Sequence, residues 1–101
     1  MGARVTKCAG GFDEQAVLDV FAREGLRPSR WSNAPYDTYA PHSHVYHKVL
    51  YCLDGSIVFR LTAAGEEIAL HPGDRLDVEP GTEHSAVVGP RGVDCIEAPR
   101  A

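Results

Sequence analysis

Three of the five histidines in this 101-residue chain lie within six positions, in the tract HSHVYHKVLYCLDG that begins at His42. His42 and His44 are two positions apart, and residues at this spacing point to the same face of a strand. Their imidazoles can therefore bind one metal ion if a neighbouring strand supplies a third ligand. His84 is the candidate for that ligand, because Gly81 in the tract PGTEH permits a sharp turn just before it.

Three histidine ligands leave open positions on an ion, which is typical of catalytic metal sites rather than closed structural ones. The predicted cofactor is a divalent transition metal, namely Fe, Zn, Ni, Cu or Mn, because imidazole ligands alone do not select among these ions. The spacing also fits solvated histidines at the entrance to a strand. The alternative is therefore a protein that binds no metal.

The chain after Pro28 predicts the strands that must position these histidines. Apolar and β-branched runs recur roughly every ten residues, and turns containing Gly or Pro separate them, which is typical of an all-β sandwich or barrel. The runs span residues 45–53, 57–62, 67–70, 75–78, 85–88 and 93–96. We expect a barrel over about residues 31–98, within a single domain that spans residues 1–101.

One helix is predicted before the barrel, over about residues 12–25. Asp13 is a suitable N-cap, and Gly25 is placed to end the helix. An apolar stripe at helical spacing is formed by Val17, Leu18, Phe21 and Ala22. A short helix with one apolar face should dock on a larger surface.

Two motifs of the cupin family resemble tracts in this chain. The first family motif is HxH, three or four residues, Glu, six residues and Gly, and the chain has His42, His44, Lys48 and Gly55 at those positions. The second family motif is similar to the tract HPGDRLDVEPGTEH, which ends at His84. The resemblance to a small, single-domain, RmlC-like cupin implies a jelly-roll β-barrel of two antiparallel sheets. It also implies that the three motif histidines hold a metal ion.

Lys48 departs from the family pattern, because it stands where the metal-binding glutamate stands. A protonated ammonium cannot coordinate an ion and repels it. Lys48 is therefore neutral beside a dication, or an anchor for an anionic substrate, or a sign that the pocket holds no metal. Three-histidine sites that lack the glutamate occur among the cupin dioxygenases that act on thiols and diketones. The lysine at position 48 therefore does not exclude a metal site in this chain.

Tyr46 and Cys52 share the strand parity of His44 and Lys48, and all of them could face the interior. Lys48, Tyr46 and Cys52 are therefore the candidate substrate-binding residues, although a thiol in a strand is more often a buried structural group. His47 has the opposite parity and is expected on the outer face.

The expected function is that of a small metal-binding cupin with a three-histidine site in its barrel. In the first hypothesis it is an enzyme, dioxygenase- or isomerase-like, that acts on a small organic and anionic molecule. In the alternative it is a non-catalytic cupin that binds or senses a small molecule, metal-free because Lys48 replaces the glutamate.

The composition of the chain limits the classes of partner that we expect the protein to bind. The net charge is −4 and there is no run of Lys or Arg, which argues against nucleic acid. No apolar run approaches the roughly 20 residues of a membrane span. Three widely spaced cysteines predict free thiols and a cytoplasmic location. The sheet edges that a jelly roll leaves exposed predict a homodimer.

Overall fold

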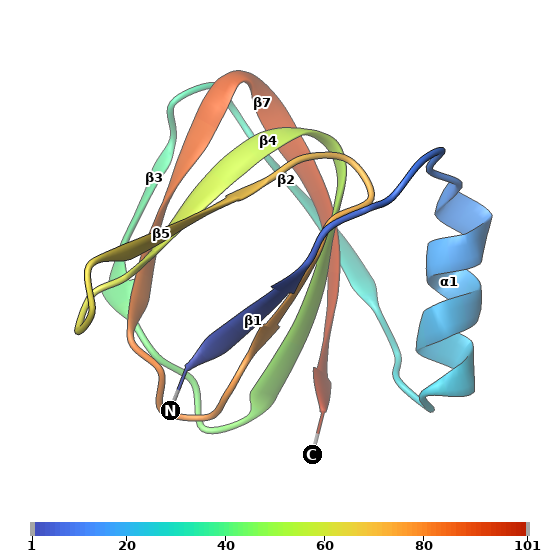
Figure 1. The fold of residues 1–101 in the computed structure, drawn as a ribbon, viewed down its shortest axis with the longest axis horizontal. Helices are drawn as coiled ribbons and strands as arrows, with labels where there is room; N and C mark the ends of the chain where they lie inside the picture. Colours follow the sequence, from blue (N-terminus) through green and yellow to red (C-terminus); the bar gives the residue numbers. More distant parts are fainter. Residues whose placement is uncertain (1, 101) are drawn as a thin grey trace.

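The structure, a computed structural model, describes residues 2–100 and has an all-β fold with one short N-terminal helix, as predicted (Figure 1). The elements in chain order are β1 (Ala3–Thr6), α1 (Glu14–Arg23), β2 (Ser29–Asn33), β3 (Thr38–His42), β4 (His47–Leu61), β5 (Glu66–Leu70), β6 (Arg75–Val78) and β7 (His84–Arg100). Within residues 2–100, no helix is long and apolar enough to cross a membrane.

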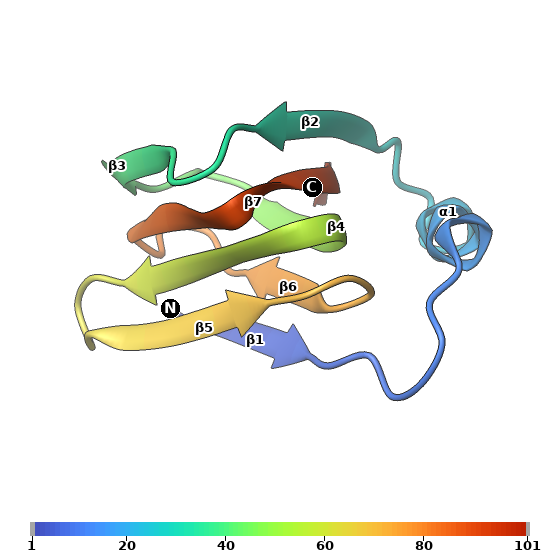
Figure 2. The same cartoon turned by 90° about the horizontal axis from the view of Figure 1, so that it is seen from above.

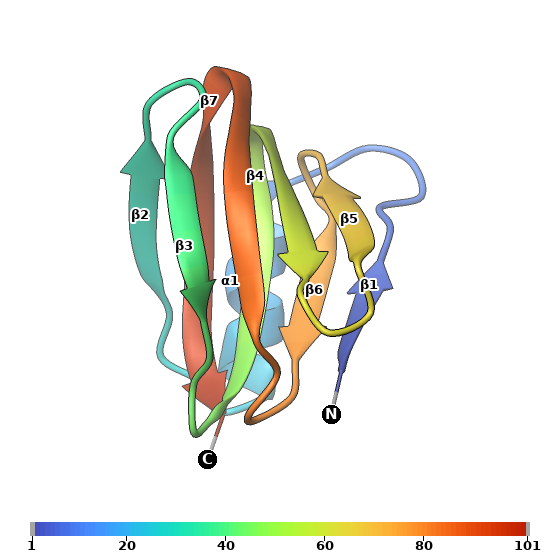
Figure 3. The ribbon, with the colours of Figure 1, turned by 90° about the vertical axis from the view of Figure 1, so that its left-hand side faces the viewer.

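Strands β4 and β7 organise the fold. They pair antiparallel over almost their whole length, and the register shifts on either side of Asp54 and Gly55. At these shifts both strands change neighbours: β4 pairs first with β6 and then with β5, while β7 pairs first with β3 and then with β2. The hydrogen-bonded sheet is thereby folded over on itself, which gives the two layers of a jelly roll (Figures 2 and 3).

We name the two layers by their position relative to α1. The helix-side half contains β1, β6, β2 and residues 47–55 and 93–100 of β4 and β7. The opposite half contains β5, β3 and residues 57–61 and 84–88 of the same two strands.

The core fills the space between the two halves. Side chains alternate along β4, so Leu50 and Cys52 point into this core, whereas Val49 and Tyr51 pack on the other side of the strand. The buried residues of the core are Leu50, Cys52, Ile57, Phe59, Leu61, Ile68, Leu70, Leu76, Val78, Ala86, Val88, Val93 and Cys95.

Helix α1 covers the outer face of the helix-side half, and Figure 1 shows it outside the barrel of strands. The Asp13 side chain accepts a hydrogen bond from the Gln15 N–H at 2.9 Å, which caps the helix as predicted. Gly25, with φ of 72°, ends it. Phe21 is 1% exposed and its ring meets Tyr51 of β4 edge-on, with the centroids 5.6 Å apart. Ala22, expected in the apolar stripe, is exposed.

The carboxylate of Asp74, in the turn between β5 and β6, ties the N-terminal segment to the barrel. Asp74 is 3% exposed and accepts hydrogen bonds from the backbone N–H groups of Cys8 at 2.8 Å and His71 at 2.9 Å, and from the Lys7 ammonium. Burial opposes the charge, but these hydrogen bonds outweigh it and hold the pKa of Asp74 below its ordinary value.

We therefore expect Asp74 to make the free energy of unfolding depend on pH in the acid range. A carboxyl whose folded pKa is depressed stabilises the protein above its unfolded pKa of about 4, and this contribution is lost as the pH falls through the folded pKa. Asp74→Asn should lose about 2 kcal/mol at pH 7 and show a shallower loss of stability below pH 4, measured by urea unfolding across pH. Asp13→Asn is the control, because Asn caps a helix as well as Asp. Equal acid profiles for wild type and Asp74→Asn would contradict this account.

Candidate metal centre

The structure brings His42, His44 and His84 together at one end of the barrel. His42 is the last residue of β3 and lies opposite His84, the first residue of β7, while His44 follows β3 in the connection to β4. One ligand nitrogen from each lies within 4.8 Å of the others. The ring centroids are 4.4 Å apart for His42 and His84, 5.0 Å for His42 and His44, and 5.6 Å for His44 and His84.

The turn that contains Gly81 delivers His84 to the site, as the sequence predicted. Gly81 has φ of 78°, a conformation that favours glycine, and its N–H donates to the carbonyl of His44 at 2.8 Å. This backbone hydrogen bond joins the turn before His84 to the segment that carries the other two histidines.

Hydrogen bonds orient two of the rings and fix which nitrogen carries the proton. Nδ1 of His42 lies 2.8 Å from the carbonyl of Ala40, and Nδ1 of His84 lies 2.9 Å from the carbonyl of Thr82. A carbonyl can only accept, so each Nδ1 carries the proton of the neutral imidazole, and Nε2 is the nitrogen that can bind an ion. Such bonds are the usual support of a metal-binding histidine.

The remaining nitrogens fit a metal ion. Nε2 of His44 and Nε2 of His84 are both buried, and neither has a hydrogen-bond partner. An unsatisfied buried acceptor is uncommon and calls for an explanation, and a bound cation supplies one. Burial lowers the pKa of both His44 and His84, with a further contribution from the nearby charge of Lys48. Both rings are therefore neutral at pH 7, as metal binding requires.

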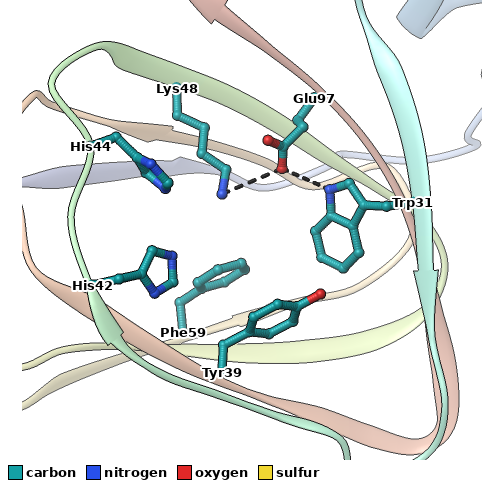
Figure 4. A pocket seen from close by; sticks show the side chains of 7 residues that line it. All are labelled: Trp31, Tyr39, His42, His44, Lys48, Phe59 and Glu97. Carbon is teal, nitrogen blue, oxygen red and sulfur yellow. Dashed lines mark hydrogen bonds and ion pairs between the residues drawn. The ribbon is translucent and has the colours of Figure 1, made fainter.

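A cavity of about 240 Å³ opens beside these histidines (Figure 4). It lies between the two halves of the barrel, so each half contributes part of its wall. The residues that line it are Trp31, Tyr39, His42, His44, Lys48, Phe59 and Glu97.

Lys48 points into the cavity and forms an ion pair with Glu97 of β7. The Lys48 side chain is 9% exposed, and its Nζ lies 3.3 Å from Oε1 of Glu97. The same oxygen accepts a hydrogen bond from Nε1 of Trp31 at 2.7 Å (Figure 4). Sequence reasoning missed Glu97, although the alternation from Val93 through Cys95 places it on the inner face of the last strand.

The other predicted binding residues do not line this cavity. The Tyr46 ring stacks on His44, with the centroids 4.9 Å apart and the planes 24° from parallel. Cys52 lies deeper in the core, fully buried and opposite Cys95 in the register of β4 and β7. His47 is on the outer face, as expected from its parity, with Nε2 3.0 Å from Oδ1 of Asp77.

A two-layered jelly roll with three converging histidines defines the class of protein, and the comparisons with known proteins agree. The family model described as the cupin domain matches residues 30–89, which is more than half of the chain. The chain belongs to the cupin family.

Solved structures support the same fold. An RmlC-like cupin from Shewanella frigidimarina is 25% identical, with a TM-score of 0.64 over 75% of this chain and 67% of that one. The polyketide cyclase RemF from Streptomyces resistomycificus is 21% identical, with a TM-score of 0.66 over 97% of this chain and 65% of that one. A DUF861 family protein from Thermotoga maritima is 13% identical, with a TM-score of 0.65 over 94% and 96% of the two chains. No curated protein matches the sequence.

Proposed function

We propose that this cupin binds one divalent transition metal ion through His42, His44 and His84 and acts on a small organic anion in the adjoining cavity. The observation that carries the proposal is the pair of buried, unpartnered Nε2 atoms on His44 and His84. When bound, such an ion supplies a Lewis acid or, if it is iron, a centre that activates oxygen.

The chain's own residues prepare the site for that role. The carbonyls of Ala40 and Thr82 hold two imidazoles in the protonation state that exposes Nε2. Lys48 offers an ammonium to an anionic group of the substrate, and the rings of Trp31, Tyr39 and Phe59 make part of the cavity wall apolar. One protein of this fold is a polyketide cyclase, so catalysis is compatible with the fold. A cytoplasmic location and a homodimer remain predictions from the sequence.

The first test is the metal content of protein purified without an affinity tag or chelator. We expect near-stoichiometric Fe, Zn, Ni, Cu or Mn by elemental analysis. Removal of the ion should lower the melting temperature, because an ion that binds only the folded state stabilises it. Protein that contains no metal and takes none up on reconstitution would contradict the proposal. It would favour the alternative, a metal-free cupin that binds or senses a small molecule through Lys48.

A further inference from the structure

A carboxylate already balances the positive charge of Lys48 inside the cavity. Among the described residues that line the cavity, Glu97 is the one carboxylate, and it holds the Lys48 ammonium at 3.3 Å. The hydrogen bond from Trp31 to the same Glu97 oxygen fixes the carboxylate against the wall. A ligand anion that binds Lys48 must therefore compete with Glu97.

With a divalent ion bound, the net positive charge of the site favours an anionic ligand. Histidines bind an ion as neutral imidazoles, so three of them beside the Lys48–Glu97 ion pair leave both positive charges of a divalent ion uncompensated by the side chains around it. The glutamate of the family motif would neutralise one of these charges, but position 48 holds a lysine. Uncompensated charge in a buried site is costly, so a ligand that brings negative charge is the preferred occupant.

The aromatic side chains that line the cavity favour a flat, apolar part of a ligand. Trp31 and Tyr39 meet edge to face, with the ring centroids 5.9 Å apart, and Phe59 lies beside His84 at 6.1 Å. Aromatic side chains favour planar rings through stacked and edge-to-face contacts. The volume of about 240 Å³ is below the roughly 300–1,000 Å³ of pockets for drug-sized ligands, so it suits a single ring.

We propose that the cavity binds a single-ring aromatic carboxylate, held by the Lys48 ammonium and packed among Trp31, Tyr39 and Phe59. This inference deepens the proposed function and rests on it for the role of the ion. It assigns Glu97 as a positioning residue that holds the ammonium in the cavity and weakens binding of the ligand by competing for it.

The two members of the pair should therefore have opposite effects on binding. Lys48→Met keeps the aliphatic length and removes the charge, and it should weaken benzoate binding by at least about tenfold. Glu97→Gln keeps an oxygen for Trp31 and Lys48 but removes the competing charge. It should strengthen benzoate binding by roughly three- to tenfold. A purely structural role for the pair would weaken binding in both variants.

The chain carries its own reporter for this experiment, because Trp31 is its single tryptophan and lines the cavity. Benzoate is titrated into wild type and both variants while Trp31 emission is followed, with benzamide as the uncharged probe and calorimetry as a second readout. Each protein is used metal-loaded and metal-free, and its metal content is measured separately. Wild type should prefer benzoate, and the preference should vanish in Lys48→Met.

The outcomes separate this inference from the proposed function. Metal-loaded wild type that binds benzoate no better than benzamide overturns the inference and leaves the metal site intact. Benzoate affinity that is unchanged in Lys48→Met, or weakened in Glu97→Gln, also overturns it. A protein that takes up no metal but shows the predicted order of affinities supports the anion site and contradicts the metal centre.

Discussion

His84→Ala should severely weaken metal binding. His84 is 1% exposed, and its Nε2 is one of the two buried nitrogens without a partner. Apparent free energies of structural zinc sites are about 10–16 kcal/mol, or roughly 2.5–4 kcal/mol for each of four ligands. Loss of one imidazole should therefore weaken affinity on the order of 100- to 1,000-fold, measured by competition with a chelator.

Two further variants make this experiment decisive. His84→Gln keeps a polar side chain of similar length, so it separates loss of the ligand from loss of packing in a buried position. His71→Ala removes an exposed histidine outside the site, whose side chain is 64% accessible, and should leave metal content unchanged. Unaltered affinity in His84→Ala, or equal losses in His84→Ala and His71→Ala, would exclude His84 as a ligand.

Gly55→Ala should destabilise the fold severely. Gly55 ends the first family motif and sits where β4 passes from one half of the barrel to the other. Its φ of 74° is strained for any residue with a Cβ, and an added Cβ would overlap the carbonyl oxygen of Gly92 on β7. Backbone strain and overpacking together should cost more than about 3 kcal/mol.

Gly65→Ala is the matched control for that substitution. Gly65 has φ of 71°, almost the same as Gly55, but a Cβ there would meet only the end of the Arg60 side chain at 3.5 Å. It should cost about 1–2 kcal/mol, the conformational strain alone. Denaturant unfolding of both variants measures the difference. Equal losses would show that the close approach of β4 and β7 at Gly55 is not what requires glycine.

The strand pattern predicted the fold class but not the length of the two central strands. The tracts LDGS and GPRG, at residues 53–56 and 89–92, contain typical turn residues, which favour breaks between the predicted runs. In the structure, β4 and β7 continue through them, because pairing with each other and with new neighbours keeps the chain extended. Strand β1 and the pairing of residues 97–100 were also missed. Both depend on partners far along the chain, which local alternation does not reveal.

For the site, parity predicted the faces of His47, Lys48 and Cys52 on β4 but not their depth, and it does not apply to His44 and Tyr46, which lie in the connection between β3 and β4. His42, His44 and His84 converge because a turn and a strand pairing join them, and the motif spacing carries that information. Cys52 has the inward parity but lies beyond the end of the cavity. Glu97 lies just beyond the last predicted run, residues 93–96, but it pairs with Leu50 in the register of β4 and β7.

The pairing of β4 with β7 also sets the order of events during synthesis. His47 lies opposite Arg100, which follows it by 53 positions (100 − 47), so the cavity closes only after the last strand has docked. Pairings of such long range form slowly, in milliseconds to seconds. Unlike a zinc finger, whose ion drives folding, this barrel must be complete before three imidazoles and an ammonium face one another. A ligand that contacts both the ion and the ammonium therefore enters a finished protein.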